Sequence, residues 1–237
     1  MKDTCYLIQP GVKVAVVYCH VPDDPQHASW AYNLINTWNA NPPGYPCDFV
    51  VACAHRPPSD QMHSMLRLIT EPQIFIHDDK GWDIGAYQAF AKESQHDMMV
   101  CLGGSSYLRR PDWLVNMVEA FIRHGPIHLY GSMGNNGEPI SNVSPHLRST
   151  GFWCSPHLMN SYPYPVTDPS QRYPFEHGPN CFTGWVYKLG RRAIVVDAEG
   201  DHDHPHFNDS PNGFHRGNQS ALLVGDRLTI PPYFAHP

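Results

Sequence analysis

Strand-like apolar runs alternate with helical patterns along the first third of the chain, and this alternation constrains the fold more than any other feature. Residues 12–18 form a β-branched run, typical of a strand that is buried on both faces of a sheet. Two further apolar runs occupy residues 48–53 and 73–76, and the segments between the runs carry apolar residues at helical spacing. Such alternation favours right-handed crossovers. We therefore expect an α/β fold with a mainly parallel central sheet and helices on both faces.

Capping and turn signals set the expected bounds of these elements. Asp24 and Pro25 are suited to open a helix that ends at the Asn-Pro-Pro-Gly of residues 41–44, and Ser59 is suited to cap a second helix. Another helix is expected to begin at Pro111. Further strands are predicted at residues 98–102, 127–130, 151–154 and 193–196, and turn-rich loops at residues 134–145 and 162–174.

Length and charge limit the class of protein. The 237 residues suffice for one sizeable domain over residues 1–237, and the net charge of −6 argues against a nucleic-acid partner, which would require a basic face. We find no run that approaches the about 18–20 apolar residues of a membrane span, and no signal-peptide pattern, so we expect a soluble cytoplasmic protein. The seven cysteines lie mostly inside apolar runs without a Cys-x-x-Cys pair, which predicts reduced core thiols.

Residues 77–87 combine acidic side chains with two glycines at the expected start of a helix near Asp83. Gly81 and Gly85 permit close approach of the backbone to a ligand, and the first N–H groups of the helix are suited to bind an anion. Carboxylates nearby would accept hydrogen bonds from sugar hydroxyls, so the pattern predicts a phosphorylated carbohydrate as ligand. The alternative is a helix start whose acidic residues only complement the helix dipole.

The sequence from Asp79 to Tyr87 resembles the Asn-x-Gly-x-Asp-x-Gly-Ala-aromatic signature of glycosyltransferases related to rhamnan synthesis protein F. Three further features follow in the order found in that family: a strand ending in small polar residues, the block of residues 146–149, and Glu176 opening a helix that ends at Gly190. The resemblance covers about residues 12–200. It implies a GT-A type, Rossmann-like domain that binds a nucleotide-sugar donor at the carboxyl ends of its strands.

The resemblance also assigns roles to particular residues. Residues 12–132 would form the nucleotide-sugar half and residues 133–237 the acceptor and catalytic half. The expected donor-binding residues are Asp79, Lys80, Gly81, Asp83, Gly85, Tyr87, Gly104, Ser105 and Ser106, and His20 is added to them because it lies at the end of the first expected strand. His146, Arg148 and Ser149 are expected beside the donor sugar or the acceptor, with Arg148 standing where the family has an amide. The alternatives are a solvated loop for the block of residues 146–149 and a simple tight turn for residues 103–106.

Glu176 is the residue expected to act as the catalytic base, because the resemblance places an acidic helix start in that position. An acid that only complements a helix dipole is the alternative. The expected acceptor cleft consists of the loops around His146 and residues 162–174, together with Trp153 and Trp185, whose rings would stack on sugars. Burial in the core is the commoner fate of such rings.

The metal requirement is left open by the sequence. Many GT-A enzymes carry an Asp-x-Asp pair that binds Mn²⁺ or Mg²⁺ where this chain has Gly-Gly-Ser-Ser at residues 103–106. Either cations such as Lys80, Arg109 and Arg110 replace the metal, or its ligands come from elsewhere. The resemblance points to His202 and His204 in the cluster at residues 201–206; capture of metal at the surface is the alternative.

The resemblance therefore implies a glycosyltransferase that moves a hexosyl or deoxyhexosyl group from a nucleotide-sugar to a glycan or other hydroxyl acceptor. One alternative is a non-catalytic relative that binds sugar nucleotides, suggested by the missing Asp-x-Asp pair. Another is a metal-dependent hydrolase that uses the cluster between His202 and His206.

Overall fold

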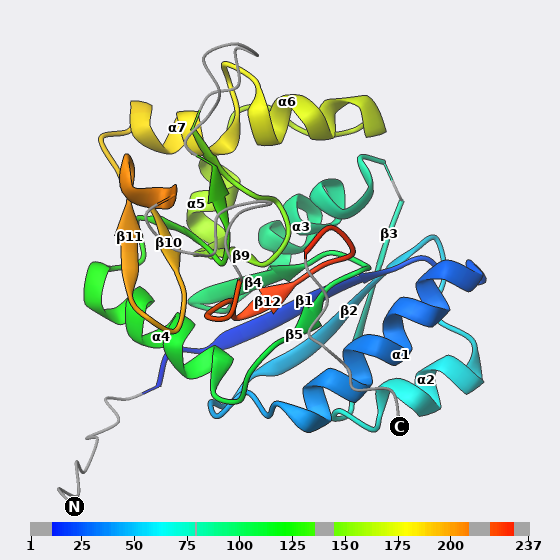
Figure 1. The fold of residues 1–237 in the computed structure, drawn as a ribbon. Helices are drawn as coiled ribbons and strands as arrows, with labels where there is room; N and C mark the ends of the chain where they lie inside the picture. The colour runs from blue at the N-terminus through cyan, green and yellow to red at the C-terminus, as the bar shows by residue number, and fades with distance from the viewer. Residues whose placement is uncertain (1–10, 79, 136–144, 209–218, 230–237) are drawn as a thin grey trace, which may run out of the picture.

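An eight-stranded sheet with strand order β11-β10-β6-β9-β4-β1-β2-β3 forms the centre of the protein (Figure 1). The computed structural model describes residues 11–78, 80–135, 145–208 and 219–229. The strands of this sheet are β1 (Val14–His20), β2 (Asp48–Ala54), β3 (Gln73–His77), β4 (Met98–Leu102), β6 (Leu129–Gly131), β9 (Phe152–Cys154), β10 (Ala193–Val196) and β11 (Asp201–Asp203). Shorter pairs are formed by β5 (Tyr107–Leu108) with β12 (Val224–Gly225), and by β7 (Gly134–Asn135) with β8 (His146–Leu147).

Parallel pairing dominates the sheet, as the sequence predicted. β1 pairs in parallel with both β2 and β4, β2 with β3, and β10 with β6. The register brings Val17 beside Val50 on one side and Cys101 on the other. Two strands run the other way: β9 lies antiparallel between β4 and β6, and β11 is an antiparallel edge strand. Both predicted segments of the chain, residues 12–132 and 133–237, contribute strands to this one sheet.

Helices cover both faces of the sheet, which confirms the predicted fold class (Figure 1). One face packs against α1, α2 and α4, where the rings of Trp38 and Trp113 meet edge to face at 5.3 Å between centroids. The other face packs against α3, α5, α6 and α7, with Phe152 of β9 in contact with Tyr87, Phe175 and Phe182. The helices are α1 (Pro25–Ala40), α2 (Asp60–Leu66), α3 (Trp82–Glu93), α4 (Trp113–His124), α5 (Pro156–Ser161), α6 (Arg172–His177) and α7 (Phe182–Lys188), with 3-10 turns η1 (Pro169–Gln171) and η2 (His206–Asn208).

The prediction of a single helix that begins at Glu176 and ends at Gly190 is wrong. Glu176 lies near the end of α6, and a separate helix, α7, follows it. The physical reason is the Gly178-Pro179 pair, because a residue before proline avoids helical backbone angles and Gly178 is extended at φ −69° and ψ 171°. The side chain of Cys181 then accepts a hydrogen bond from the N–H of Gly184 and starts α7. Glu176 therefore has no place at a helix N-terminus.

Two predictions about the chain as a whole can be compared with the described residues. All six cysteines among them are free thiols; five are buried, as predicted for core thiols, whereas Cys47 is only half-buried. Within the same residues, every helix is too short or too polar to span a bilayer.

Candidate active site

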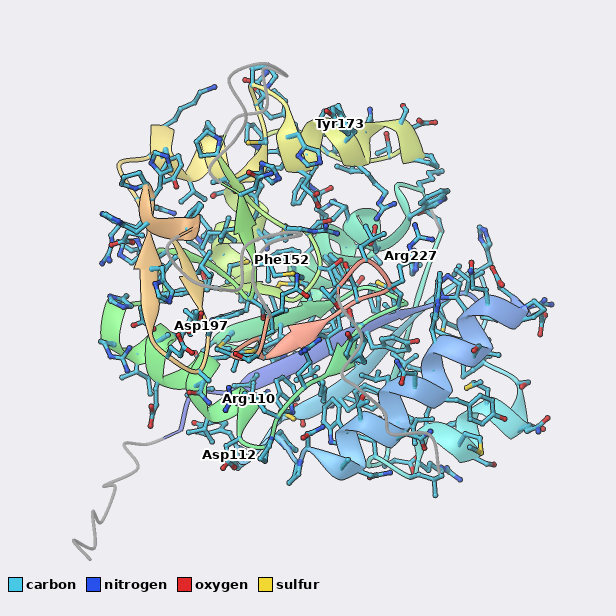
Figure 2. All side chains as sticks on the ribbon, viewed as in Figure 1. Arg110, Asp112, Phe152, Tyr173, Asp197 and Arg227 are labelled. Carbon is cyan, nitrogen blue, oxygen red and sulfur yellow. The ribbon has the colours of Figure 1, made fainter. Side chains whose placement is uncertain are left out.

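A cavity of about 770 Å³ opens at the carboxyl-terminal edge of the parallel strands. Its lining combines the ends of β1 and β3, the turn after β4, the start of α3 and the loop before β9. The first turns of α1, the turn η1, α6 and the segment after β12 complete the lining, and they include Tyr173 on α6 and Arg227 after β12 (Figure 2). Because ligands of α/β sheets bind outside the carboxyl ends of the strands, this cavity is the candidate active site.

The cavity brings together about half of the residues that the sequence singled out. Those that line it are His20, Asp83, Gly104, Ser105, Arg148, Ser149 and Glu176. Those described residues that do not line it are Lys80, Gly81, Gly85, Tyr87, Ser106, His146, His202 and His204. Asp79 lies outside the described residues.

Gly81 and Gly85 have structural reasons of their own to be glycine. Gly81 precedes α3 with a φ of +78°, and a Cβ there would lie 2.1 Å from the carbonyl oxygen of Val166. A Cβ on Gly85 would lie 1.9 Å from the carbonyl oxygen of Lys80. Tyr87, two residues further along α3, is fully buried in the core. This part of the motif therefore packs α3 beneath the cavity, and only Trp82 and Asp83 of the helix reach its lining.

The turn after β4 lies at the cavity and has no carboxylate on it. The N–H of Ser106 donates to the carbonyl of Gly103 at 2.9 Å and closes the turn, and Tyr18 donates its hydroxyl to the carbonyl of Gly104 at 2.9 Å. A Cβ on Gly104 would lie 2.5 Å from the ring of His27, so this glycine allows α1 to approach the turn. Four residues that offer only backbone groups and hydroxyls do not fit Mn²⁺ or Mg²⁺ in the manner of an Asp-x-Asp pair.

Asp83 is held by an arginine that the sequence analysis did not single out. Nη2 of Arg172 donates to Oδ2 of Asp83 at 3.1 Å, and Nε of the same residue lies 2.8 Å from Oδ1. Burial raises the pKa of Asp83, although the positive charge of Arg172 opposes this shift. The guanidinium carbon of Arg172 also lies 5.2 Å from the ring centroid of Trp82. Arg172 thus joins α6 to the start of α3 across the cavity lining.

Glu176 is the centre of a second hydrogen-bonded group in the cavity lining. Its Oε2 accepts hydrogen bonds from the backbone N–H of Ser149 at 2.8 Å and from the Ser149 hydroxyl, and its Oε1 lies 3.0 Å from Nε2 of His177. Burial acts to raise the pKa of Glu176, but the hydrogen bond from His177, the charge of Arg148 and the bonds from Ser149 outweigh it and lower the pKa to about 2. Glu176 is therefore ionised at neutral pH.

Arginines, and not the predicted Lys80, Arg109 and Arg110, supply the cationic charge of the lining. The three that line the cavity are Arg148, Arg172 and Arg227. Lys80 lies outside it in an exposed ion pair with Asp78 at 3.1 Å. Two of the lining arginines are paired, Arg172 with Asp83 as described and Arg148 with the buried Asp226.

Arg148 and Asp226 form a buried ion pair, in which Nη2 donates to Oδ2 at 3.1 Å and the two side chains are 9% and 4% exposed. Within the described residues, Arg227 is the lining arginine without an ion pair; its guanidinium carbon lies 5.9 Å from the ring centroid of Trp30. The exposed guanidinium of Arg227 is therefore available to an anionic ligand.

His20 lies at the end of β1 and lines the cavity, as expected for a residue at a strand end. Its side chain is 3% exposed, and Nδ1 is buried with no hydrogen-bond partner. Burial and the nearby His27 lower the pKa of His20 to about 4, against a smaller opposing effect of Asp24. The imidazole is neutral at pH 7, so His20 offers a ligand hydrogen bonds but no positive charge.

The predicted metal residues His202 and His204 lie on β11 and just after it, away from the cavity lining. Nε2 of His202 lies 3.3 Å from Oδ2 of the buried Asp197 (Figure 2), and His204 packs near Phe207 with 5.8 Å between ring centroids. In the part of the chain that the structure describes, neither belongs to a group of three close metal-binding side chains. The metal role of these two residues stays a prediction.

The aromatic residues at the cavity also differ from those predicted. Trp153 is fully buried and stacks on Tyr130 at 5.7 Å between centroids, and Trp185 packs against the core. Neither lines the cavity, whereas Trp82 and Tyr173 do, with 49% and 64% of their surface exposed. Tyr173 stood in a segment that the sequence indicated only as a turn-rich loop.

Comparison with known proteins adds a fold assignment. No family model matches the chain, and no curated protein sequence matches it, so the resemblance to rhamnan synthesis protein F stays a prediction. Among solved structures, the mannosyltransferase PcManGT from Pyrobaculum calidifontis, described in complex with GDP-Man and Mn²⁺, is similar with a TM-score of 0.54 and 13% identity over 78% of this chain and 54% of that one.

Two further solved structures are similar at lower scores. HddC from Yersinia pseudotuberculosis has a TM-score of 0.45 at 12% identity, with 65% of this chain and 82% of that chain covered. TarS of S. aureus has a TM-score of 0.44 at 12% identity, with coverages of 64% and 30%. The likeness to the mannosyltransferase, together with the strand order, shows that the chain has a Rossmann-like fold of the GT-A type.

Proposed function

We propose that the chain is a glycosyltransferase that moves a sugar from a nucleotide-sugar donor to a hydroxyl group of a glycan. The observation that carries this proposal is the position of the cavity, outside the carboxyl ends of the parallel strands of a GT-A fold. Its volume of about 770 Å³ lies within the range of about 300–1,000 Å³ that is typical of small-molecule sites. The similar mannosyltransferase is described with GDP-Man bound, which supports the same class of donor here.

The donor would lie along the strand ends. His20, the turn of residues 103–105 and the first turn of α3 line this part of the cavity and offer backbone groups, hydroxyls and the carboxylate of Asp83 to the nucleoside and sugar. Arg227 would pair with the diphosphate, because its guanidinium is exposed at the cavity and can form bidentate hydrogen bonds with phosphate oxygens. Arginine charge would then contribute to stabilising the leaving group.

The acceptor would approach over Trp82 and Tyr173. Both rings are exposed at the cavity, and sugar rings stack well on exposed aromatic faces. Trp82 has a φ of +54°, which is unfavourable for an aromatic residue, and strain of this kind gathers at functional sites. The sequence resemblance favours a hexosyl or deoxyhexosyl group as the sugar transferred between these two parts of the cavity.

The base role of Glu176 stays a prediction, and its surroundings argue against it. A carboxylate with a pKa of about 2 is a weak base at neutral pH, because efficient general bases have pKa values near the working pH. Both of its oxygens already face hydrogen-bonding groups, one on Ser149 and one on His177. Such a carboxylate is better suited to hold its neighbours in place than to accept a proton.

The test of the proposed function is a binding and turnover screen of the purified chain against UDP, GDP, dTDP and CMP and their sugars, with and without Mn²⁺. A bound nucleotide-sugar should raise the melting temperature. When a glycan acceptor is added, mass spectrometry should detect release of the free nucleotide. Binding without any transfer or donor hydrolysis would instead indicate a non-catalytic sugar-nucleotide-binding protein.

Two arginine variants make this screen specific to the cavity. Arg227→Gln removes the proposed diphosphate partner and should weaken nucleotide binding by about tenfold, which corresponds to about 1.4 kcal/mol. Arg110→Gln is the matched control, because Arg110 lies before α4 and does not line the cavity (Figure 2). Equal affinities of the two variants would remove Arg227 from the donor site.

A further inference from the structure

His146, Glu176 and His177 bring two imidazoles and a carboxylate to one place beside the cavity. One nitrogen of each ring and one oxygen of Glu176 lie within 4.8 Å of one another. In the described part of the chain, no other group of three histidine, cysteine or acidic residues gathers so closely. His146 comes from β8, whereas Glu176 and His177 are the last two residues of α6, so tertiary packing assembles the group.

We propose that these three residues bind one divalent transition-metal ion, zinc or manganese. Two imidazole nitrogens with one carboxylate oxygen are a common ligand set for such ions, and they leave coordination positions open for water or a ligand. Magnesium is the poorer choice, because it prefers a shell of oxygen atoms and keeps several of its waters. The proposed site is separate from the turn after β4, where an Asp-x-Asp pair would stand.

The geometry of the side chains requires little change to accept an ion. Nε2 of His177 lies 3.0 Å from Oε1 of Glu176, a separation close to that of two neighbouring ligands whose bonds to one ion measure about 2.0–2.2 Å. The rings of His146 and His177 meet nearly at right angles, with 4.2 Å between their centroids. Nδ1 of His177 is buried and lacks a hydrogen-bond partner, so the ring meets Glu176 through Nε2 alone.

Neighbouring residues hold the three side chains in place, as hydrogen-bond partners of metal ligands commonly do. The backbone N–H of Ser149 donates to Oε2 of Glu176 at 2.8 Å and fixes the carboxylate. His146 is 1% exposed, so its ring has little freedom to turn away. The positive charge of Arg148 is offset by the buried Asp226. The carboxylates of Glu176 and Asp226 together with this one arginine therefore leave a net negative charge, which favours a cation.

An ion in this position would face the cavity, because Glu176 and His177 both line it, whereas His146 is buried and does not. Its open coordination positions would therefore be accessible to water or to an oxygen of a molecule in the cavity.

The test measures metal binding alone, with the full chain and without nucleotide, so its result does not depend on glycosyl transfer. The chain is stripped with a chelator and titrated with ZnCl₂, MnCl₂ and MgCl₂ by calorimetry, and metal content after desalting is measured by mass spectrometry. We expect one zinc or manganese ion per chain and weaker binding of magnesium. Absence of stoichiometric zinc and manganese binding would overturn the proposal.

Three variants locate the ion. His177→Gln should weaken binding at least tenfold, whereas His157→Gln, at an exposed histidine of α5, should leave it unchanged. The double variant His202→Gln with His204→Gln should also bind as the original chain does. Loss of the ion in this double variant, or full binding by His177→Gln, would contradict the proposed ligands.

A measurement on the unaltered chain guards against a variant that fails to fold. X-ray absorption of the zinc-loaded protein should give a first shell of nitrogen and oxygen with the scattering pattern of two imidazoles. A sulfur shell, or a shell without imidazole, would overturn the assignment irrespective of the variants.

Discussion

Two neighbouring glycines after β4 differ in what surrounds them, and this difference can be tested residue by residue. A Cβ on Gly104 would lie 2.5 Å from the ring of His27, whereas a Cβ on Gly103 would lie 3.6 Å from Asp83 Oδ2, which is ordinary contact. We expect Gly104→Ala to lower the free energy of unfolding by about 1–3 kcal/mol, because the ring must move. Gly103→Ala should fold normally and narrow the cavity. Urea unfolding of both variants checks this, and equal stabilities would show that the turn adapts freely.

His20 predicts a pH dependence whose sign follows from its lowered pKa. Its pKa is about 4 in the folded chain against an ordinary value of 6.5, so the unfolded chain binds the proton more readily. The stabilising effect of neutral His20 is complete above pH 6.5 and is lost as the pH falls toward 4. We expect His20→Gln to reduce the loss of stability between pH 7 and pH 4.5, as measured by urea unfolding. His157→Gln, at an exposed site, is the control variant.

At the scale of elements, the buried pair of Arg148 and Asp226 joins the loop before β9 to the segment after β12. Asp226→Asn removes the charge that compensates Arg148, and breaking one side of a buried pair costs about 3–5 kcal/mol. The variant should therefore melt at a clearly lower temperature. Adding Arg148→Met should recover part of the loss, because the uncompensated charge of Arg148 is then removed. A double variant less stable than Asp226→Asn would contradict this account.

The sequence predicted the elements whose signal is local. β4 and β10 were predicted with the bounds observed, because a strand that is buried on both faces is a continuous apolar run in the sequence. The antiparallel direction of β9 could not be predicted, because three apolar residues carry no direction and the neighbouring strands decide it. The helix α6 was missed because a proline-rich segment reads as loop, although Pro174 falls in the first turn, where proline is tolerated.

The same reasoning explains which site residues the sequence could find. His20 and the turn of residues 103–105 were found because they follow strands directly, where ligands of parallel sheets bind. Arg172 reaches its partner Asp83 only through tertiary packing, 89 residues away along the chain, and no spacing rule connects the two. Asp226 and Arg227 follow the apolar run of residues 221–224, and this strand-end signal could have indicated them.

At the scale of the whole molecule, the cavity is assembled from segments that span most of the described chain. Its lining runs from the end of β1 to the loop after β12, so a bound ligand would touch segments that are remote in sequence. These include η1 and α6, which the structure connects to the start of α3 through Arg172 and to the loop before β9 through Glu176. A ligand that fills the cavity should therefore reduce the local opening of all of these segments together.

Hydrogen exchange can measure this joint response. We expect a nucleotide-sugar that raises the melting temperature to slow amide exchange in residues 19–21, 103–105, 148–150, 169–177 and 226–228, which line or border the cavity. Exchange in α2 and β11 should not change, because neither contributes to the lining. If only the strand ends are protected and α6 is unaffected, the ligand lies on the strand edge alone. The proposed acceptor surface at Trp82 and Tyr173 would then be separate from the donor site. Protection of α6 together with the strand ends is the result that a single cavity requires.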